Sequence, residues 1–84
     1  MLAQTLWGSE INLKKEHGGR FIHKIPQGAL VFVASLHGKF AIVIHEETKL
    51  IVPTASLKLI QNEQDIIPQE DLELKYHNKR NSNK

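Results

Sequence analysis

The sequence contains no cysteine, three prolines and five aromatic residues, and it has no long apolar run. Without cysteine no disulfide can stabilise the fold and no thiolate can act as a nucleophile or metal ligand, which favours a reducing compartment. The longest apolar stretch, residues 29–34, is far shorter than the roughly 20 residues that a membrane helix needs. Residues 1–7 lack the basic segment and following apolar run of a signal peptide. We therefore expect a soluble, cytoplasmic domain.

Neither sign of charge is in large excess, because the net charge is +2 at pH 7. A value this small does not indicate a nucleic-acid partner by itself. The charges are unevenly distributed: residues 61–74 hold five acidic residues and no basic one, and residues 75–84 hold four basic ones. Adjacent blocks of this kind are typical of a solvated segment, with an interaction arm as the alternative. We predict a domain over residues 1–60 and a charged, partly disordered tail over residues 61–84.

What the sequence does contain is a series of short strand patterns. Residues 29–35 and 40–45 are rich in β-branched and apolar side chains, and the polar connection between them predicts a hairpin. Gly28 follows a proline-containing turn and can adopt a positive φ there. About five short strands with tight turns in about 60 residues predict a small antiparallel barrel or sandwich. One short helix can begin after Pro68.

The stretch 28–60 resembles the second half of a Src-homology-3 domain. It shows Gly28 before a strand, the apolar hairpin, the short strand Ile51-Val52 running into Pro53, a one-turn 3₁₀ segment at 54–56 and a last strand. Bacterial Src-homology-3-like domains share this pattern. The resemblance implies an all-β, Src-homology-3-like antiparallel barrel of about five strands. The residues that it places inside the barrel are Val31, Val33, Ala41, Val43, Val52 and Leu57.

The chain departs from that family at the family's peptide groove. The paired tryptophans of the family correspond to Phe40 and Ala41 here, and the groove tyrosine corresponds to Ser56. Proline-rich peptides pack on aromatic faces, so we do not expect this chain to bind them.

The hairpin has a second apolar face. If Val31 and Val43 point inward, alternation makes Leu30, Phe32 and their neighbours on the second strand point outward. Such a patch reaches the few hundred Å² that mark an interaction site. The alternatives are internal cover by residues 2–7 or 66–67, or a different register. The pattern predicts a non-enzymatic protein-interaction or adaptor module that self-associates or docks a partner through this face. The predicted interface residues are Leu30, Phe32, Phe40, Ile42 and Ile44.

A basic, glycine-containing loop over residues 14–20 supports a second hypothesis, a small nucleic-acid-binding barrel. Lysine, arginine and glycine amides can contact phosphates, although a solvated loop is the simpler interpretation. The candidate contacts are Lys14, Lys15, Arg20, Lys39, Lys79 and Arg80.

No catalytic, cofactor or metal motif is present in the sequence. The five histidines show no metal-ligand spacing, and His37 and His45, in a hairpin turn and at a strand end, are predicted to be exposed. The serines lie in no nucleophile-elbow context. We therefore expect no enzyme, no cofactor and no metal; an enzyme assembled at an oligomer interface is a third hypothesis. The composition is that of a small bacterial or phage accessory protein.

Overall fold

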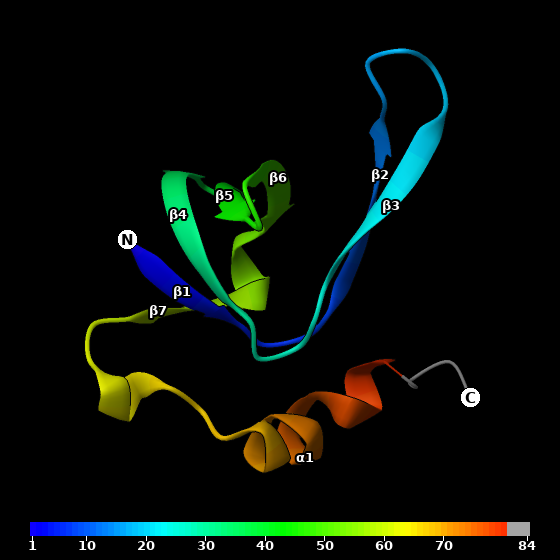
Figure 1. Ribbon diagram of the computed structural model, residues 1–84. Coiled ribbons are helices and arrows are strands. Elements are labelled where there is room, and N and C mark those ends of the chain that lie inside the picture. Colours follow the sequence, from blue (N-terminus) through cyan, green and yellow to red (C-terminus); the bar gives the residue numbers. More distant parts are fainter. Residues whose placement is uncertain (81–84) are drawn as a thin grey trace.

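The computed structural model describes residues 1–80 of the chain, and the side chains of residues 1–76. The fold is built mainly from antiparallel strands, followed by one C-terminal helix (Figure 1). A five-stranded sheet has the order β6-β5-β4-β1-β7, and a two-stranded hairpin, β2-β3, projects from it. The strands are β1 (Leu2–Thr5), β2 (Ser9–Lys14), β3 (Arg20–Ile25), β4 (Leu30–His37), β5 (Phe40–His45), β6 (Thr48–Pro53) and β7 (Leu57–Ile60).

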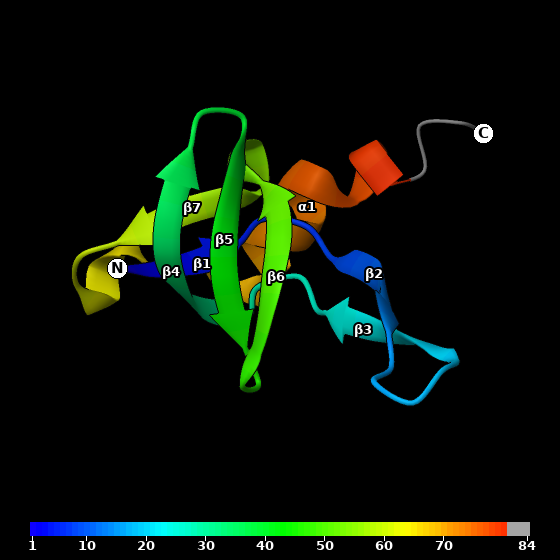
Figure 2. The same cartoon turned by 90° about the horizontal axis from the view of Figure 1, so that it is seen from above.

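The predicted all-β class is confirmed, and the predicted hairpin is β4 and β5. The sheet does not close into a barrel, because β6 and β7 are its two outer strands and do not pair with each other. The chain leaves β6 at Pro53, which has no N–H to donate, and turns through the 3₁₀ helix η1 (Thr54–Ser56). It then pairs with β1 as β7. In Figure 2, β4, β5 and β6 form one layer, and β1 and β7 run behind it.

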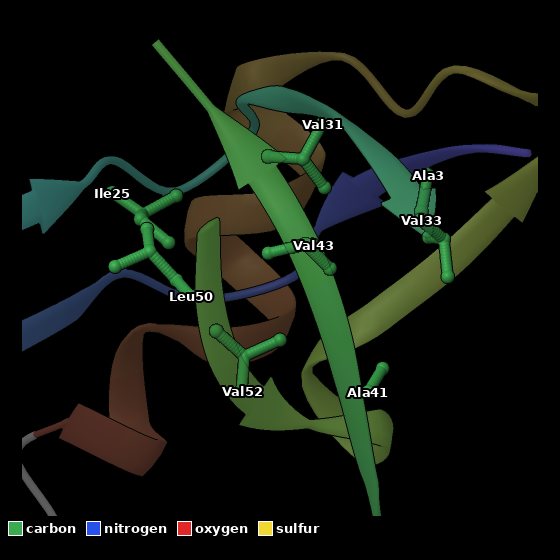
Figure 3. Packing of buried hydrophobic residues seen from close by; sticks show 8 residues of the cluster. All are labelled: Ala3, Ile25, Val31, Val33, Ala41, Val43, Leu50 and Val52. Carbon is green, nitrogen blue, oxygen red and sulfur yellow. The ribbon is translucent and has the colours of Figure 1, made fainter. Parts of the chain in front are cut away.

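The core lies between the two parts of the sheet and the base of the hairpin (Figure 3). Small and β-branched side chains fill it, as expected for inward positions of short strands. Of the residues predicted to point inward, Leu57 is half-buried and the other five are buried. Ile25 from β3 and Leu50 from β6 also belong to this core. The core residues are Ala3, Ile25, Val31, Val33, Ala41, Val43, Leu50 and Val52.

The C-terminal segment is attached to the sheet rather than separate from it. It contains a second 3₁₀ turn, η2 (Glu63–Asp65), and the helix α1 (Gln69–Arg80). The amide of Gln4, buried in β1, donates to the Ile67 carbonyl at 3.0 Å and accepts from the Ile67 N–H at 2.8 Å. Leu72 of α1 is fully buried. The tail predicted over residues 61–84 thus contains η2 and α1, which is described as far as Arg80, and residues 81–84 lie outside the described residues.

Asp65 closes the turn η2. Its carboxylate accepts from the N–H groups of Gln61, at 2.8 Å, and Asn62, at 3.2 Å. These backbone hydrogen bonds, assisted by the charge of Lys58, lower the pKa of Asp65 below its ordinary value of 3.8.

A folded-state pKa below the unfolded value means that Asp65 stabilises the turn above the unfolded pKa and loses that contribution as the pH falls through the folded value. We expect a carboxyl-carbon NMR titration of Asp65 to have its midpoint below 3.8. Asp65→Asn should remove the corresponding acid-induced shift changes of the Gln61 and Asn62 amides. A midpoint at or above the ordinary value would contradict the two hydrogen bonds.

Candidate protein-interaction surface

One side of the β4-β5-β6 layer, together with the paired end of β1, is mostly apolar, although Ser35 lies opposite Ile42 and Lys49 opposite Ile44 on the same side. Residues directly opposite one another on antiparallel strands point to the same side. Phe32 lies opposite Leu2 on β1 and Ile44 on β5, and Ile42 lies opposite Ile51 on β6. Leu30 and Phe40 share this side by alternation along β4 and β5. We call this surface the outer face: Leu2, Leu30, Phe32, Phe40, Ile42, Ile44 and Ile51.

The outer face is open to solvent. Phe32 is 52% exposed and Ile51 63% exposed, while Ile42 and Ile44 are half-buried among their neighbours at the centre. The exposed parts amount to on the order of 500 Å² of apolar surface, near the upper end for the largest patch on a monomer. All five predicted interface residues lie on this face.

No segment within residues 1–80 covers the β4-β5-β6 part of the outer face. Figure 2 shows β4, β5 and β6 in front, with α1 behind them. Leu2 belongs to the face and is itself exposed, and Ile66 is exposed beside a hollow of about 200 Å³ next to Leu2. The internal cover considered from the sequence is therefore not present over β4, β5 and β6 in the described part of the chain, whereas Ile67 pairs with the side chain of Gln4, which lies opposite Leu30 on β1.

A β-bulge between Val33 and Ser35 shifts the register of β4 against β5. The shift places His37 opposite Phe40, and the two rings stack with centroids 5.6 Å apart. Ser35 Oγ lies 2.8 Å from His37 Nε2 in a hydrogen bond. This polar group and Lys39 border one end of the outer face.

The opposite end of the face is bordered by the β5–β6 turn. Its two central residues, Glu46 and Glu47, are both exposed and both have positive φ angles. The outer face therefore has Lys39 at one end of β5 and Glu47 at the other, with Lys49 opposite Ile44 on β6.

Two members of the outer face, Leu2 and Ile51, were missed at the sequence level. The run Leu50-Ile51-Val52 contains three apolar residues in succession, so an outward Ile51 could have been found from its buried neighbours on either side. Leu2 joins the face because β1 pairs with β4, a contact between residues about 30 positions apart that no local pattern shows.

The basic residues of the nucleic-acid hypothesis lie on separate elements. Lys14 and Arg20 face each other at the tip of the β2-β3 hairpin, with Lys15 in the loop. Lys39 is in the β4–β5 turn, well away from that tip in both Figure 1 and Figure 2. Lys79 and Arg80 belong to the end of α1, and their side chains lie outside the described residues. The described side chains thus form no continuous basic surface.

Two histidines that are far apart in the sequence meet between the hairpin and the sheet. His23 Nε2, from β3, lies 2.8 Å from His45 Nδ1, at the end of β5, and the rings pack edge to face with centroids 5.1 Å apart. His23 is buried and His45 is half-buried, so the predicted exposure of His45 is wrong, whereas His37 is exposed. Sequence reasoning missed the pair because 22 residues separate its members.

A larger hollow of about 500 Å³ lies between the base of the hairpin and α1. Its charged lining residues are Glu10, Lys24 and Glu73. Because these charges have both signs, the hollow shows no preference for an anion or a cation.

Comparison with protein-family models, with curated proteins and with solved structures finds no match to this chain. Within residues 1–80, none of the helices has the length and apolar character that crossing a bilayer requires.

Proposed function

We propose that this chain is a small Src-homology-3-like β domain that acts as a protein-interaction module, and that its outer face binds the outer face of a second copy. The observation that carries the proposal is the exposed, mostly apolar outer face, centred on β4, β5 and β6. The Src-homology-3-like assignment is supported by the strand order, with Pro53 and the one-turn η1 between β6 and β7.

The size of the outer face suits self-association. Two copies would together bury about 1,000 Å², the lower limit for a specific interface and consistent with a weak or transient dimer. The half-buried Ile42 and Ile44 would form its dry centre. The polar Ser35, His37 and Lys49 would form part of a solvated rim, as in most interfaces.

The charges at the ends of β5 favour one orientation. In the aligned class of face-to-face sheet packing, the strands of the two sheets stay within about 30° of parallel or antiparallel. In an antiparallel arrangement about a two-fold axis, Lys39 of each copy approaches Glu47 of the other, whereas a parallel arrangement brings like charges together. The antiparallel arrangement is the one we propose.

Sedimentation equilibrium over a wide concentration range tests this function. We expect the mass to rise from 9.6 kDa towards twice that value as the concentration increases. Lys39→Glu should raise the dissociation constant about 3- to 10-fold, since each dimer contains two such rim pairs worth up to about 1 kcal/mol each. The double variant Lys39→Glu/Glu47→Lys should recover the wild-type value.

A monomeric mass at every concentration would overturn self-association. A dimer whose affinity falls further in the double variant would refute the antiparallel arrangement.

A further inference from the structure

We propose that His23, His45 and Glu46 form a binding site for one divalent transition-metal ion, for which Zn²⁺ is the best-suited probe. The site lies where the β2-β3 hairpin meets the end of β5, and its histidines are on the inner side of the sheet. It is therefore separate from the outer face and does not depend on self-association.

The three side chains converge closely enough to share an ion. One ligand atom from each of them lies within 4.8 Å of the other two. Tetrahedral Zn²⁺ with bonds of about 2.0–2.2 Å to nitrogen and oxygen keeps its ligand atoms roughly 3.3 Å apart. The nitrogens of His23 and His45, now 2.8 Å apart, need to separate by only about half an ångström, and the carboxylate needs to move closer.

The two imidazoles and one carboxylate of this site are ligands that suit divalent transition-metal ions. Imidazole suits zinc, copper and nickel, and one carboxylate with two imidazoles is a common three-ligand set for zinc that leaves a fourth position for water. Calcium and magnesium prefer sites made of oxygen atoms alone. We therefore expect binding of Zn²⁺, Co²⁺ or Ni²⁺ in preference to Mg²⁺.

Burial supports the same site. A buried imidazole requires a polar partner, and the polar partner of His23 in the structure is the ring of His45. A single N–H between the rings satisfies one nitrogen as donor and the other as acceptor. A metal ion between them would accept the lone pairs of both nitrogens.

The backbone conformation of the turn that carries Glu46 is an independent indication of a functional site. Glu46 has φ +51° and Glu47 has φ +66°, in a two-residue connection between His45 and Thr48. Such turns favour asparagine and glycine, because a Cβ atom is unfavourable at positive φ. Residues held in uncommon backbone conformations cluster at functional sites. Here the conformation keeps the Glu46 carboxylate beside the histidines.

The experiment is calorimetric titration of Zn²⁺ into the full chain, together with thermal unfolding and the visible absorption of the Co²⁺ complex. We expect one ion per chain and a four-coordinate Co²⁺ spectrum. A free concentration of one hundred times the Kd should raise Tm by on the order of 10 °C. Mg²⁺ should leave Tm unchanged.

Glu46→Gly and Glu47→Gly form a matched pair of variants. Both remove a Cβ at positive φ, so both should raise the Tm of the metal-free protein by a similar amount. Glu46→Gly should weaken Zn²⁺ binding at least tenfold, whereas Glu47→Gly should bind Zn²⁺ as the wild type does. His45→Gln should abolish binding while the far-UV circular dichroism is retained.

The other histidines provide the specificity control. The triple variant His17→Gln/His37→Gln/His77→Gln should keep the wild-type affinity and stoichiometry. The proposal is overturned if that variant loses the ion, if Glu46→Gly or a folded His45→Gln binds as tightly as the wild type, or if the wild type shows no saturable binding at millimolar Zn²⁺.

Discussion

Phe32→Asp is expected to be a monomer at concentrations where the wild-type chain is a dimer. Phe32 lies between Leu2 and Ile44 on the outer face. In the proposed dimer, the new carboxylate would be buried against apolar side chains with no partner, which costs several kcal/mol. A loss of about 3 kcal/mol raises the dissociation constant by more than a hundredfold. The measurement is sedimentation equilibrium of both chains at matched concentrations.

Ile22→Asp is the matched control for that substitution. Ile22 is 53% exposed, almost the same as Phe32, and lies on the projecting β3 rather than on the outer face. The substitution Ile22→Asp should leave the dimer intact. The far-UV spectrum of Phe32→Asp should stay that of a folded β protein, because an exposed side chain contributes little to the core. If Phe32→Asp unfolds, Phe32 is a core residue; if it stays folded and dimeric, the outer face is not the interface.

Leu72→Ala is expected to lower the free energy of unfolding by about 2–4 kcal/mol. Leu72 is fully buried and lies against the Gly28 turn, where a Cβ added to that glycine would be 3.2 Å from Leu72 Cδ1. Removing its side chain opens a cavity between α1 and the sheet. Urea unfolding followed by circular dichroism measures the change.

Leu74→Ala is the control on the same helix. Leu74 is 81% exposed, so its truncation should change the free energy of unfolding by less than about 0.5 kcal/mol. Equal, small effects of the two substitutions would mean that α1 does not dock on the sheet in solution, and that residues 61–84 behave as the separate tail expected from their composition.

The local elements were predictable because their signal is carried by neighbouring residues. The β-branched and apolar residues of 29–35 and 40–45 located β4 and β5, and the resemblance to Src-homology-3 domains placed Val31 and Val43, which are buried, on the inside and left Phe32, which is exposed, on the outside. The proline and the polar residues after it located η1. The same residues of 29–35 and 40–45 predicted the apolar outer face. Successive side chains of a strand point to opposite sides, so a strand that is apolar at every position has apolar side chains on both sides.

The docking of the C-terminal helix was not predictable from its own residues. The segment is strongly polar, and a single buried leucine is too weak a pattern to indicate a packed helix. Its attachment depends on Gln4, whose side chain pairs with Ile67, 63 residues away. Helix propensity and hydrophobic periodicity depend on neighbours along the chain, so they cannot predict a partner that is this distant in the sequence.

By itself, then, the sequence determined the strand class, the β4-β5 hairpin, the inward and outward sides of its strands, and most of the outer face. The tertiary structure alone decided that the sheet stays open, that Leu2 extends the outer face, that α1 packs against the turn at Gly28, and that His23 meets His45 beside Glu46. The physical reason is the separation of the contacting residues along the sequence. Alternation and turn preferences act over a few residues, whereas these contacts arise when strands distant in sequence are brought together around one core.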